Sequence, residues 1–308
     1  MRRAFLVVVL ALVPLLAAGA LPQALTPAAA APLASVPVTS VPLLVGGEAR
    51  AYLIAVPGTS APPSPRAGRA LLIVLDGYAL TPQHAALHYG LTALATATGT
   101  VVAEGVPGRG LPSWDAGSCC APASARGRDD VGYVRAVVAD AVAHEGVDQR
   151  RVVVAGFSNG AMLAYRVACD TGPLVAAIAV VSGSRLVGTC PRRSPVLVLV
   201  VHGLLDPTVP FAGRQVRSHD LVPVPTRSVR TSLAPLLRVD GCVGLPPELV
   251  LETPRRTVTT IRPRCARDAV SVVVDRALGH AWPRGQRSVG GLDASALVLA
   301  EVRATAHR

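Results

Sequence analysis

This 308-residue chain contains no lysine, and aromatic residues make up only 3% of it. All 30 basic residues are arginine, and a lysine-free chain rich in Ala, Arg and Val is typical of a GC-rich genome. The formal net charge of +11 therefore reflects codon usage as much as a binding surface, and we predict no nucleic-acid partner. The scarcity of aromatic rings argues against a protein that stacks bases or sugars on aromatic platforms.

Patterns typical of metal sites are also missing. The six cysteines include no C-x-x-C pair and have no supporting histidine spacing, so we predict no metal site. Apolar sequence is abundant instead. Hydrophobic residues make up 51% of the chain and charged residues 16%, which excludes a mostly disordered protein. The length suits one large α/β domain or two small ones.

The first twenty residues have the three parts of a secretory signal peptide. Arg2 and Arg3 are positively charged, residues 4–18 form an apolar run of fifteen, and residues 18–20 read A-G-A, a small-residue cleavage site. We expect cleavage after Ala20, secretion, and no stable membrane association afterwards. Two alternatives stay open. The segment could remain as an uncleaved anchor, since uncharged residues continue to position 22, and the twin-arginine route could export it.

After residues 1–20, the pattern predicts a lead-in and one folded domain. Residues 21–49 are rich in Ala, Pro, Ser and Val and are expected to be disordered, whereas residues 50–308 form a single α/β domain. The alternation of apolar runs and helical patterns predicts a mostly parallel central sheet with helices on both faces. Strands are expected at 51–56, 71–75, 100–103, 151–155, 176–181, 196–201 and 270–274, and helices near 87–94, 129–142, 159–169 and 292–303.

The strongest motif is Gly156-Phe157-Ser158-Asn159-Gly160, which follows the strand-like run RVVVA and precedes the helical run AMLAYRVAC. In this position G-x-S-x-G is typical of the nucleophile elbow of an α/β-hydrolase, a tight turn that presents the serine hydroxyl at the edge of the sheet. We therefore predict the α/β-hydrolase fold with Ser158 as the nucleophile. The alternative is an ordinary Gly-rich turn with a bystander serine.

A serine nucleophile needs a base, and the base needs an acid that orients it. Asp206 lies in the segment HGLLDP after the strand-like run VLVLVV, and His280 lies in GHAWP after the run VSVVVD. Both are expected at the same sheet edge as Ser158, in the chain order Ser, Asp, His of this fold. We predict a catalytic triad of Ser158, Asp206 and His280. In the alternatives, Asp206 is only a turn residue and His280 only a surface histidine.

Neighbouring residues complete the predicted site. The main-chain N–H groups of Asn159 and of Tyr78, in the loop after residues 71–75, are expected to form the oxyanion hole. Trp282 stands two residues after His280, and Trp114 lies in a loop expected at the same edge, so both are predicted to line the substrate pocket. Simple packing in the core is the alternative for each tryptophan.

Seven segments between residues 51 and 285 follow one another in the chain: YLIAVP, LLIVLDGY, SWDAGSCCAPA, DDVGYVRAVV, VDQRRVVVAGFSNGAMLAYRVACD, VLVLVVHGLLDPTVPF and GHAWP. In sequence and in order, they resemble the secreted poly(3-hydroxybutyrate) depolymerase-like esterases, a family that includes feruloyl and acetylxylan esterases. The resemblance implies a carboxylic ester hydrolase without a metal or organic cofactor, in which Ser158 is the nucleophile, Asp206 the acid and His280 the base.

One residue of the predicted pocket departs from the family pattern. The family has His-Gly after the third strand, where this chain has Asp76-Gly77. A carboxylate close to the developing oxyanion opposes it, so the sequence predicts weaker activity than in other members and a gain in activity for Asp76→His. The effect shrinks if Asp76 points away or pairs with an arginine.

Six cysteines in an exported chain favour disulfides. Their positions relative to the expected strands favour the pairs 242–265 and 169–190, which leaves 119 and 120 as a vicinal disulfide or as two free thiols. Other connectivities stay open, because a disulfide between adjacent residues is strained. The predicted disulfide residues are Cys119, Cys120, Cys169, Cys190, Cys242 and Cys265.

The sequence therefore predicts a secreted serine esterase that acts on short hydroxyalkanoate oligomers or small soluble esters. Three alternatives stay open: a feruloyl or acetylxylan esterase, a secreted acyltransferase that uses the same triad, and a catalytically silent binding protein with the hydrolase fold. The predicted partner is a small-molecule or oligomeric ester. Neither the acyl group nor the oligomeric state follows from the sequence.

Overall fold

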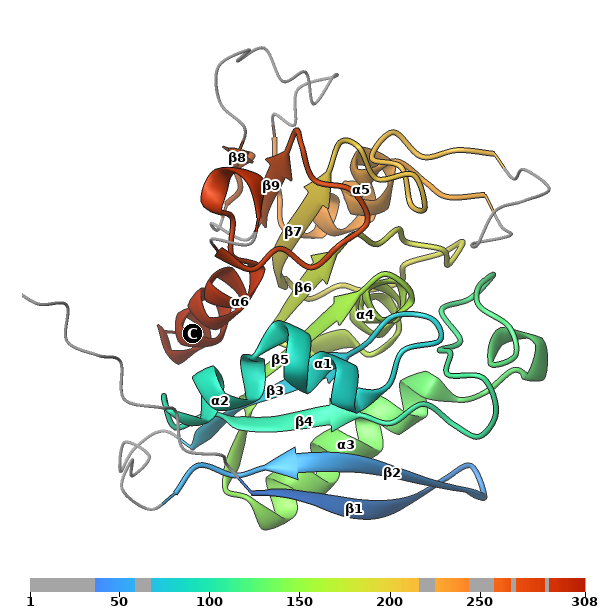
Figure 1. Ribbon diagram of the computed structural model, residues 1–308, viewed down its shortest axis with the longest axis vertical. Helices are drawn as coiled ribbons and strands as arrows, with labels where there is room; N and C mark the ends of the chain where they lie inside the picture. Colours follow the sequence, from blue (N-terminus) through green and yellow to red (C-terminus); the bar gives the residue numbers. More distant parts are fainter. Residues whose placement is uncertain are drawn as a thin grey trace, which may run out of the picture. The chain divides into compact units, whose positions relative to one another are not determined.

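The computed structural model describes residues 37–58, 68–215, 225–243, 258–266, 270–285 and 288–307. Within these ranges one sheet has the strand order β1-β2-β4-β3-β5-β6-β7-β9-β8 (Figure 1). The strands β4, β3, β5, β6, β7 and β9 run parallel, and β1, β2 and β8 pair antiparallel at the two edges. Their bounds are β1 (Val38–Val45), β2 (Glu48–Ala55), β3 (Arg69–Leu75), β4 (Val101–Gly105), β5 (Val147–Phe157), β6 (Ala177–Val181), β7 (Leu197–Gly203), β8 (Val258–Ile261) and β9 (Val270–Asp275).

Helices cover both faces of the sheet because side chains alternate along each strand. In β3, Leu71, Ile73 and Leu75 pack into one core cluster with α3, α4 and α5, whereas Leu72 and Val74 pack into a second with α1, α2 and α6. The predicted fold class is therefore confirmed. The helices are α1 (Pro82–Tyr89), α2 (Leu91–Thr96), α3 (Asp130–His144), α4 (Asn159–Asp170), α5 (Val229–Val239) and α6 (Ala294–Ala304).

The fold begins before the predicted boundary at residue 50, so this part of the prediction is wrong. β1 lies inside the segment that was expected to be disordered, and it forms a hairpin with β2. The turn uses Gly46 and Gly47, whose φ angles of 56° and 83° suit glycine. Residues 1–20, the predicted signal peptide, lie outside the described residues. No helix in the described ranges is long and apolar enough to cross a membrane.

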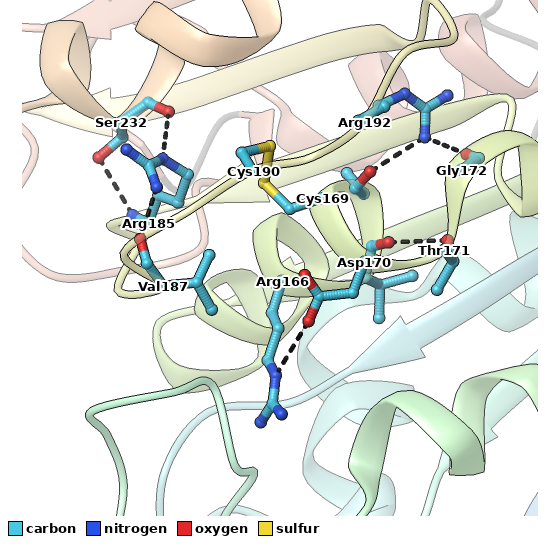
Figure 2. Close-up of a disulfide and its surroundings, with 12 residues drawn as sticks. Arg166, Cys169, Asp170, Thr171, Gly172, Arg185, Val187, Cys190, Arg192 and Ser232 are labelled. Atoms are coloured by element: carbon cyan, nitrogen blue, oxygen red, sulfur yellow. Dashed lines mark hydrogen bonds and ion pairs between the residues drawn. A yellow bond between two sulfur atoms is a disulfide. The ribbon is translucent and has the colours of Figure 1, made fainter.

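Three disulfides join the six cysteines: Cys119–Cys120, Cys169–Cys190 and Cys242–Cys265. The pairings agree with those that the sequence favoured. Figure 2 shows that the second one ties the end of α4 to the segment before β7, beside Arg192. The Arg192 guanidinium donates to main-chain oxygens, including Ala168 O at 3.1 Å. Burial lowers the pKa of Arg192 to about 10, and the opposing attraction of Asp240 is smaller, so this arginine remains charged at neutral pH.

A buried carboxyl on β4 makes stability depend on pH. Burial raises the pKa of Glu104 to about 7, despite the hydrogen bond from Thr92. A raised pKa means that the folded state holds its proton more tightly than the unfolded state, so stability falls as pH rises from about 4.5 through 7. Glu104→Gln changes the free energy of unfolding by a different amount at each pH. We expect this change to be more stabilising at pH 9 than at pH 4 by roughly 3 kcal/mol. Chemical unfolding of both proteins at these two pH values tests this, and an identical pH dependence would contradict it.

Candidate active site

Ser158 sits in a tight turn between β5 and α4. Its φ of 51° is uncommon for a residue other than glycine, and backbone strain of this kind is found at nucleophile elbows. The two glycines of the motif are sterically required. A Cβ on Gly160 would lie 2.1 Å from Leu75 O, and one on Gly156 would lie 2.4 Å from the main chain of Gly160. The absence of side chains at these two glycines therefore allows the turn to lie this close to β3.

The structure brings Ser158, His280 and Asp206 together from three segments. His280 follows β9 and Asp206 follows β7, so both reach the carboxyl edge of the sheet next to the elbow. The Ser158 Oγ lies 2.9 Å from His280 Nε2, and His280 Nδ1 lies 2.8 Å from Asp206 Oδ2. These distances allow a proton to pass from the hydroxyl to the imidazole while the carboxylate orients the ring.

Asp206 is held as an anion. Burial by itself raises the pKa of this carboxyl, but the hydrogen bond from His280 and the N–H of Val209 lower it by more, and the pKa lies below its usual range. The other oxygen, Oδ1, accepts from the N–H groups of Thr208 and Val209 at 2.9 and 2.8 Å. Nearby, burial lowers the pKa of His202, so this ring is neutral. Its Nε2 donates to Val209 O at 2.7 Å and so holds the loop that contains Asp206.

The start of α4 offers donors beside the serine. Asn159 is the first residue of the helix, so its main-chain N–H has no partner within the helix. Its side chain is engaged elsewhere: Oδ1 accepts from Trp114 N at 2.7 Å, and Nδ2 donates to Trp114 O at 3.0 Å. These two hydrogen bonds join the loop between β4 and α3 to the elbow. The main-chain N–H belongs to a helix N-terminus, where developing negative charge is favoured.

Two of the residues predicted to line a pocket do not do so. Trp114 has no exposed surface and donates from Nε1 to the main-chain oxygen of Asp76 at 2.9 Å, so it anchors a loop. Asp76 is only 2% exposed. Its Oδ1 accepts from the Gly77 N–H at 2.7 Å and from the Tyr89 hydroxyl, and its Oδ2 lies 2.7 Å from His84 Nδ1. The carboxylate is therefore bound to three groups of its own loop and of α1.

Trp282 is half-buried, and it stacks on Tyr89 with ring centroids 4.1 Å apart and an angle of 18° between the planes. Its Nε1 donates to Ser295 Oγ at 3.0 Å. The ring of Phe157 lies 4.9 Å from that of His280. Sequence analysis did not identify Tyr89 or His84 as neighbours of the site, because nothing in the spacing of α1 indicates which of its side chains turn toward β3. It also gave no role to Phe157, which ends β5 directly before Ser158.

The sheet order, with an elbow serine at its carboxyl edge, defines the class of α/β-hydrolases. Residues 123–226 match the family described as Phospholipase/Carboxylesterase. A Nocardia uniformis subsp. tsuyamanensis protein with the name "Putative esterase NocK" is 31% identical over 260 residues, which span 79% of this chain and 73% of that protein. The chain belongs to the α/β-hydrolase esterase family, and it is a carboxylic ester hydrolase.

Other relatives match shorter parts. A bifunctional acetylxylan esterase/xylanase of Neocallimastix patriciarum is 28% identical over 52% of this chain and 22% of its own length. Feruloyl esterase B of Piromyces equi is 26% identical over 48% of this chain and 28% of its own length. Among solved structures, the acetyl xylan esterase from Aspergillus awamori aligns with a TM-score of 0.56 at 15% identity, over 79% of this chain and 94% of that one. This last likeness concerns the fold.

Proposed function

We propose that the chain is a secreted serine esterase in which Ser158, His280 and Asp206 form the catalytic triad. The observation that carries the proposal is the continuous hydrogen-bonded line from the elbow hydroxyl to the imidazole, at 2.9 Å, and on to a buried carboxylate, at 2.8 Å. The substrates that we propose are small soluble esters, with short hydroxyalkanoate oligomers among them. The resemblance to depolymerase-like esterases supports this choice.

In the first half of the reaction, Ser158 Oγ attacks the ester carbonyl carbon and its proton moves to His280 Nε2. The carbonyl oxygen becomes an oxyanion that the N–H groups of Asn159 and Tyr78 stabilise. When the intermediate collapses, the bond between the carbonyl carbon and the leaving oxygen breaks. His280 returns the proton to the departing alcohol, and the acyl group remains on Ser158. Throughout, Asp206 keeps Nδ1–H of His280 in place and stabilises the imidazolium.

In the second half, water replaces the alcohol. His280 Nε2 takes a proton from the water as its oxygen attacks the acyl carbon, and the same two N–H groups stabilise the new oxyanion. Collapse of this intermediate releases the carboxylic acid and returns the proton to Ser158 Oγ.

Secretion is supported by two features. The first twenty residues have the composition of a signal peptide, and the described part of the chain contains three disulfides, which persist in oxidising compartments.

The edge of the site has exposed apolar surface, because Leu205, directly before Asp206, is 64% exposed. An apolar residue at this place suits the hydrocarbon part of an ester.

Hydrolysis of p-nitrophenyl acetate, butyrate and octanoate and of methyl ferulate, by the wild type and by Ser158→Ala, tests the proposal. We expect Ser158-dependent hydrolysis of the p-nitrophenyl esters, with the rate against chain length indicating the size of the acyl site. If methyl ferulate is the preferred substrate, the second candidate, a feruloyl esterase, replaces the first. The name of the Piromyces equi relative favours this alternative. Equal rates in both proteins would contradict the triad.

A further inference from the structure

The loop that carries Tyr78 is pressed against the nucleophile elbow. A Cβ on Gly77 would lie 3.1 Å from Phe157 Cδ1 and 3.4 Å from Ser158 Cβ, and a Cβ on Gly160 would lie 2.6 Å from the main-chain oxygen of Asp76. That same oxygen accepts from the buried Trp114 indole. Since Tyr78 follows directly, small movements of the chain at residues 76–77 move the N–H that we assign to the oxyanion hole.

The side chain of Asp76 fixes this piece of main chain from the other side. Its Oδ1 accepts from the Gly77 N–H at 2.7 Å, which sets the orientation of the peptide between residues 76 and 77. The same oxygen accepts from the Tyr89 hydroxyl. Burial, together with the nearby Asp76 carboxylate, raises the pKa of Tyr89, so the hydroxyl keeps its proton and remains a donor.

Tyr89 extends this contact to the segment that holds His280. Its ring stacks on Trp282, two residues after His280, and Ser295 Oγ both accepts from Trp282 Nε1 and donates to Tyr89 O at 2.6 Å. The ring of Phe157 lies 6.2 Å from that of Tyr89 and 4.9 Å from that of His280. The Tyr89 side chain therefore contacts both Asp76, which binds the Gly77 N–H, and Trp282, which lies two residues after His280.

We propose that Asp76 and Tyr89 are a positioning pair. Asp76 holds the 76–77 peptide so that the Tyr78 N–H faces the oxyanion, and Tyr89, whose ring stacks on Trp282, holds the Asp76 carboxylate in place. The inference rests on the proposed function, because it concerns the geometry of that same site. It also reverses the expectation for Asp76→His. A neutral imidazole has one acceptor nitrogen and cannot accept three donors, so this substitution lowers kcat instead of raising it.

Two conservative variants test the pair. Tyr89→Phe keeps the stacked ring and removes only the hydroxyl, and Asp76→Asn keeps the size of the side chain but turns one acceptor into a donor. We expect kcat for p-nitrophenyl butyrate to fall about 10-fold in the first and about 100-fold in the second, with KM within about threefold of wild type. Inhibition by a trifluoromethyl ketone, whose adduct with Ser158 carries an oxyanion, is expected to weaken in the same order.

Tyr52→Phe is the matched control. The Tyr52 hydroxyl donates to Asp140 Oδ2 at 2.6 Å, so it is also a buried tyrosine bonded to a carboxylate, but it joins β2 to α3, and neither element contributes to the site. Both phenylalanine variants are expected to unfold at a lower temperature than the wild type. Only Tyr89→Phe is expected to change kcat and the inhibition constant.

The possible results separate the two proposals. Values of kcat and of the inhibition constant within twofold of wild type in Tyr89→Phe would overturn the positioning role, and so would a rise in KM at unchanged kcat. If, at the same time, Ser158→Ala is inactive, the proposed function stands without the pair. Hydrolysis that persists in Ser158→Ala would overturn both.

Discussion

Replacing Ser158 with alanine is expected to lower kcat for ester hydrolysis by about four to six orders of magnitude. The substitution removes the attacking oxygen and leaves the imidazole and the carboxylate in place, so only water at the site remains as a nucleophile. The measurement is the steady-state hydrolysis of p-nitrophenyl butyrate by purified protein. Circular dichroism and thermal unfolding are expected to match the wild type, since the turn geometry stays with the neighbouring glycines.

Ser182 provides a control for this result. It follows β6 as Ser158 follows β5, it has the same φ of 51°, and it is fully buried. Ser182→Ala removes a hydroxyl from an equally unusual backbone conformation without touching His280. We expect kcat within about threefold of wild type. A loss as large as that in Ser158→Ala would mean that the strained turns, and not the nucleophile, account for the effect.

Asp206→Asn is expected to lower kcat by about four orders of magnitude. The side chain keeps its size and can still accept from the N–H groups of Thr208 and Val209. The amide, however, neither stabilises the imidazolium nor requires His280 to carry its proton on Nδ1, so the tautomer that leaves Nε2 free to act as base is lost. Burst kinetics with p-nitrophenyl acetate measure the acylation step directly, which is the step that we expect to slow.

The matched variant is Asp275→Asn. Asp275 ends β9, five residues before His280, and it is buried, with Oδ1 accepting from Ala277 N at 2.8 Å. As a rival acid near the same strand ends, it tests whether any buried carboxylate at this edge supports the histidine. We expect its replacement to leave kcat within a few-fold of wild type. A larger loss in Asp275→Asn than in Asp206→Asn would assign the acid to Asp275 instead.

The sheet could be predicted because its strands carry strong local signals. β3, β6 and β7 each contain an apolar run, ALLIVL, AIAVV and LVLVV, as strands buried on both faces require. The elbow at Ser158 has glycines at the two places where a side chain would collide with main chain. β1 was missed because its residues belong to a stretch rich in Ala, Pro, Ser and Val. There, pairing with β2 and not composition makes the strand.

The site was predictable where chain order and strand ends determine position, and not where packing between distant helices does. Ser158 follows β5, Asp206 follows β7 and His280 follows β9. These strands lie within the parallel part β5-β6-β7-β9 of the sheet, so the topology brings the three residues to one edge. The surroundings of Asp76 depend instead on how α1 lies across β3, which brings Tyr89 and His84 to the carboxylate. The sequence pattern does not indicate how α1 packs on β3. The sequence therefore predicted that the Asp76 carboxylate faces the oxyanion.

The two hydrogen bonds of the proposed triad join residues that are 74 and 122 positions apart in the chain. Such long loops must close before the bonds can form, and the entropy of closure makes contacts of this kind slow to appear. When the denatured protein is returned to native conditions, helical signal from α3 and α4 is expected to recover first. Enzymatic turnover then appears only after β5, β7 and β9 have all docked. Regained catalysis is therefore a stricter measure of refolding yield than any spectroscopic signal.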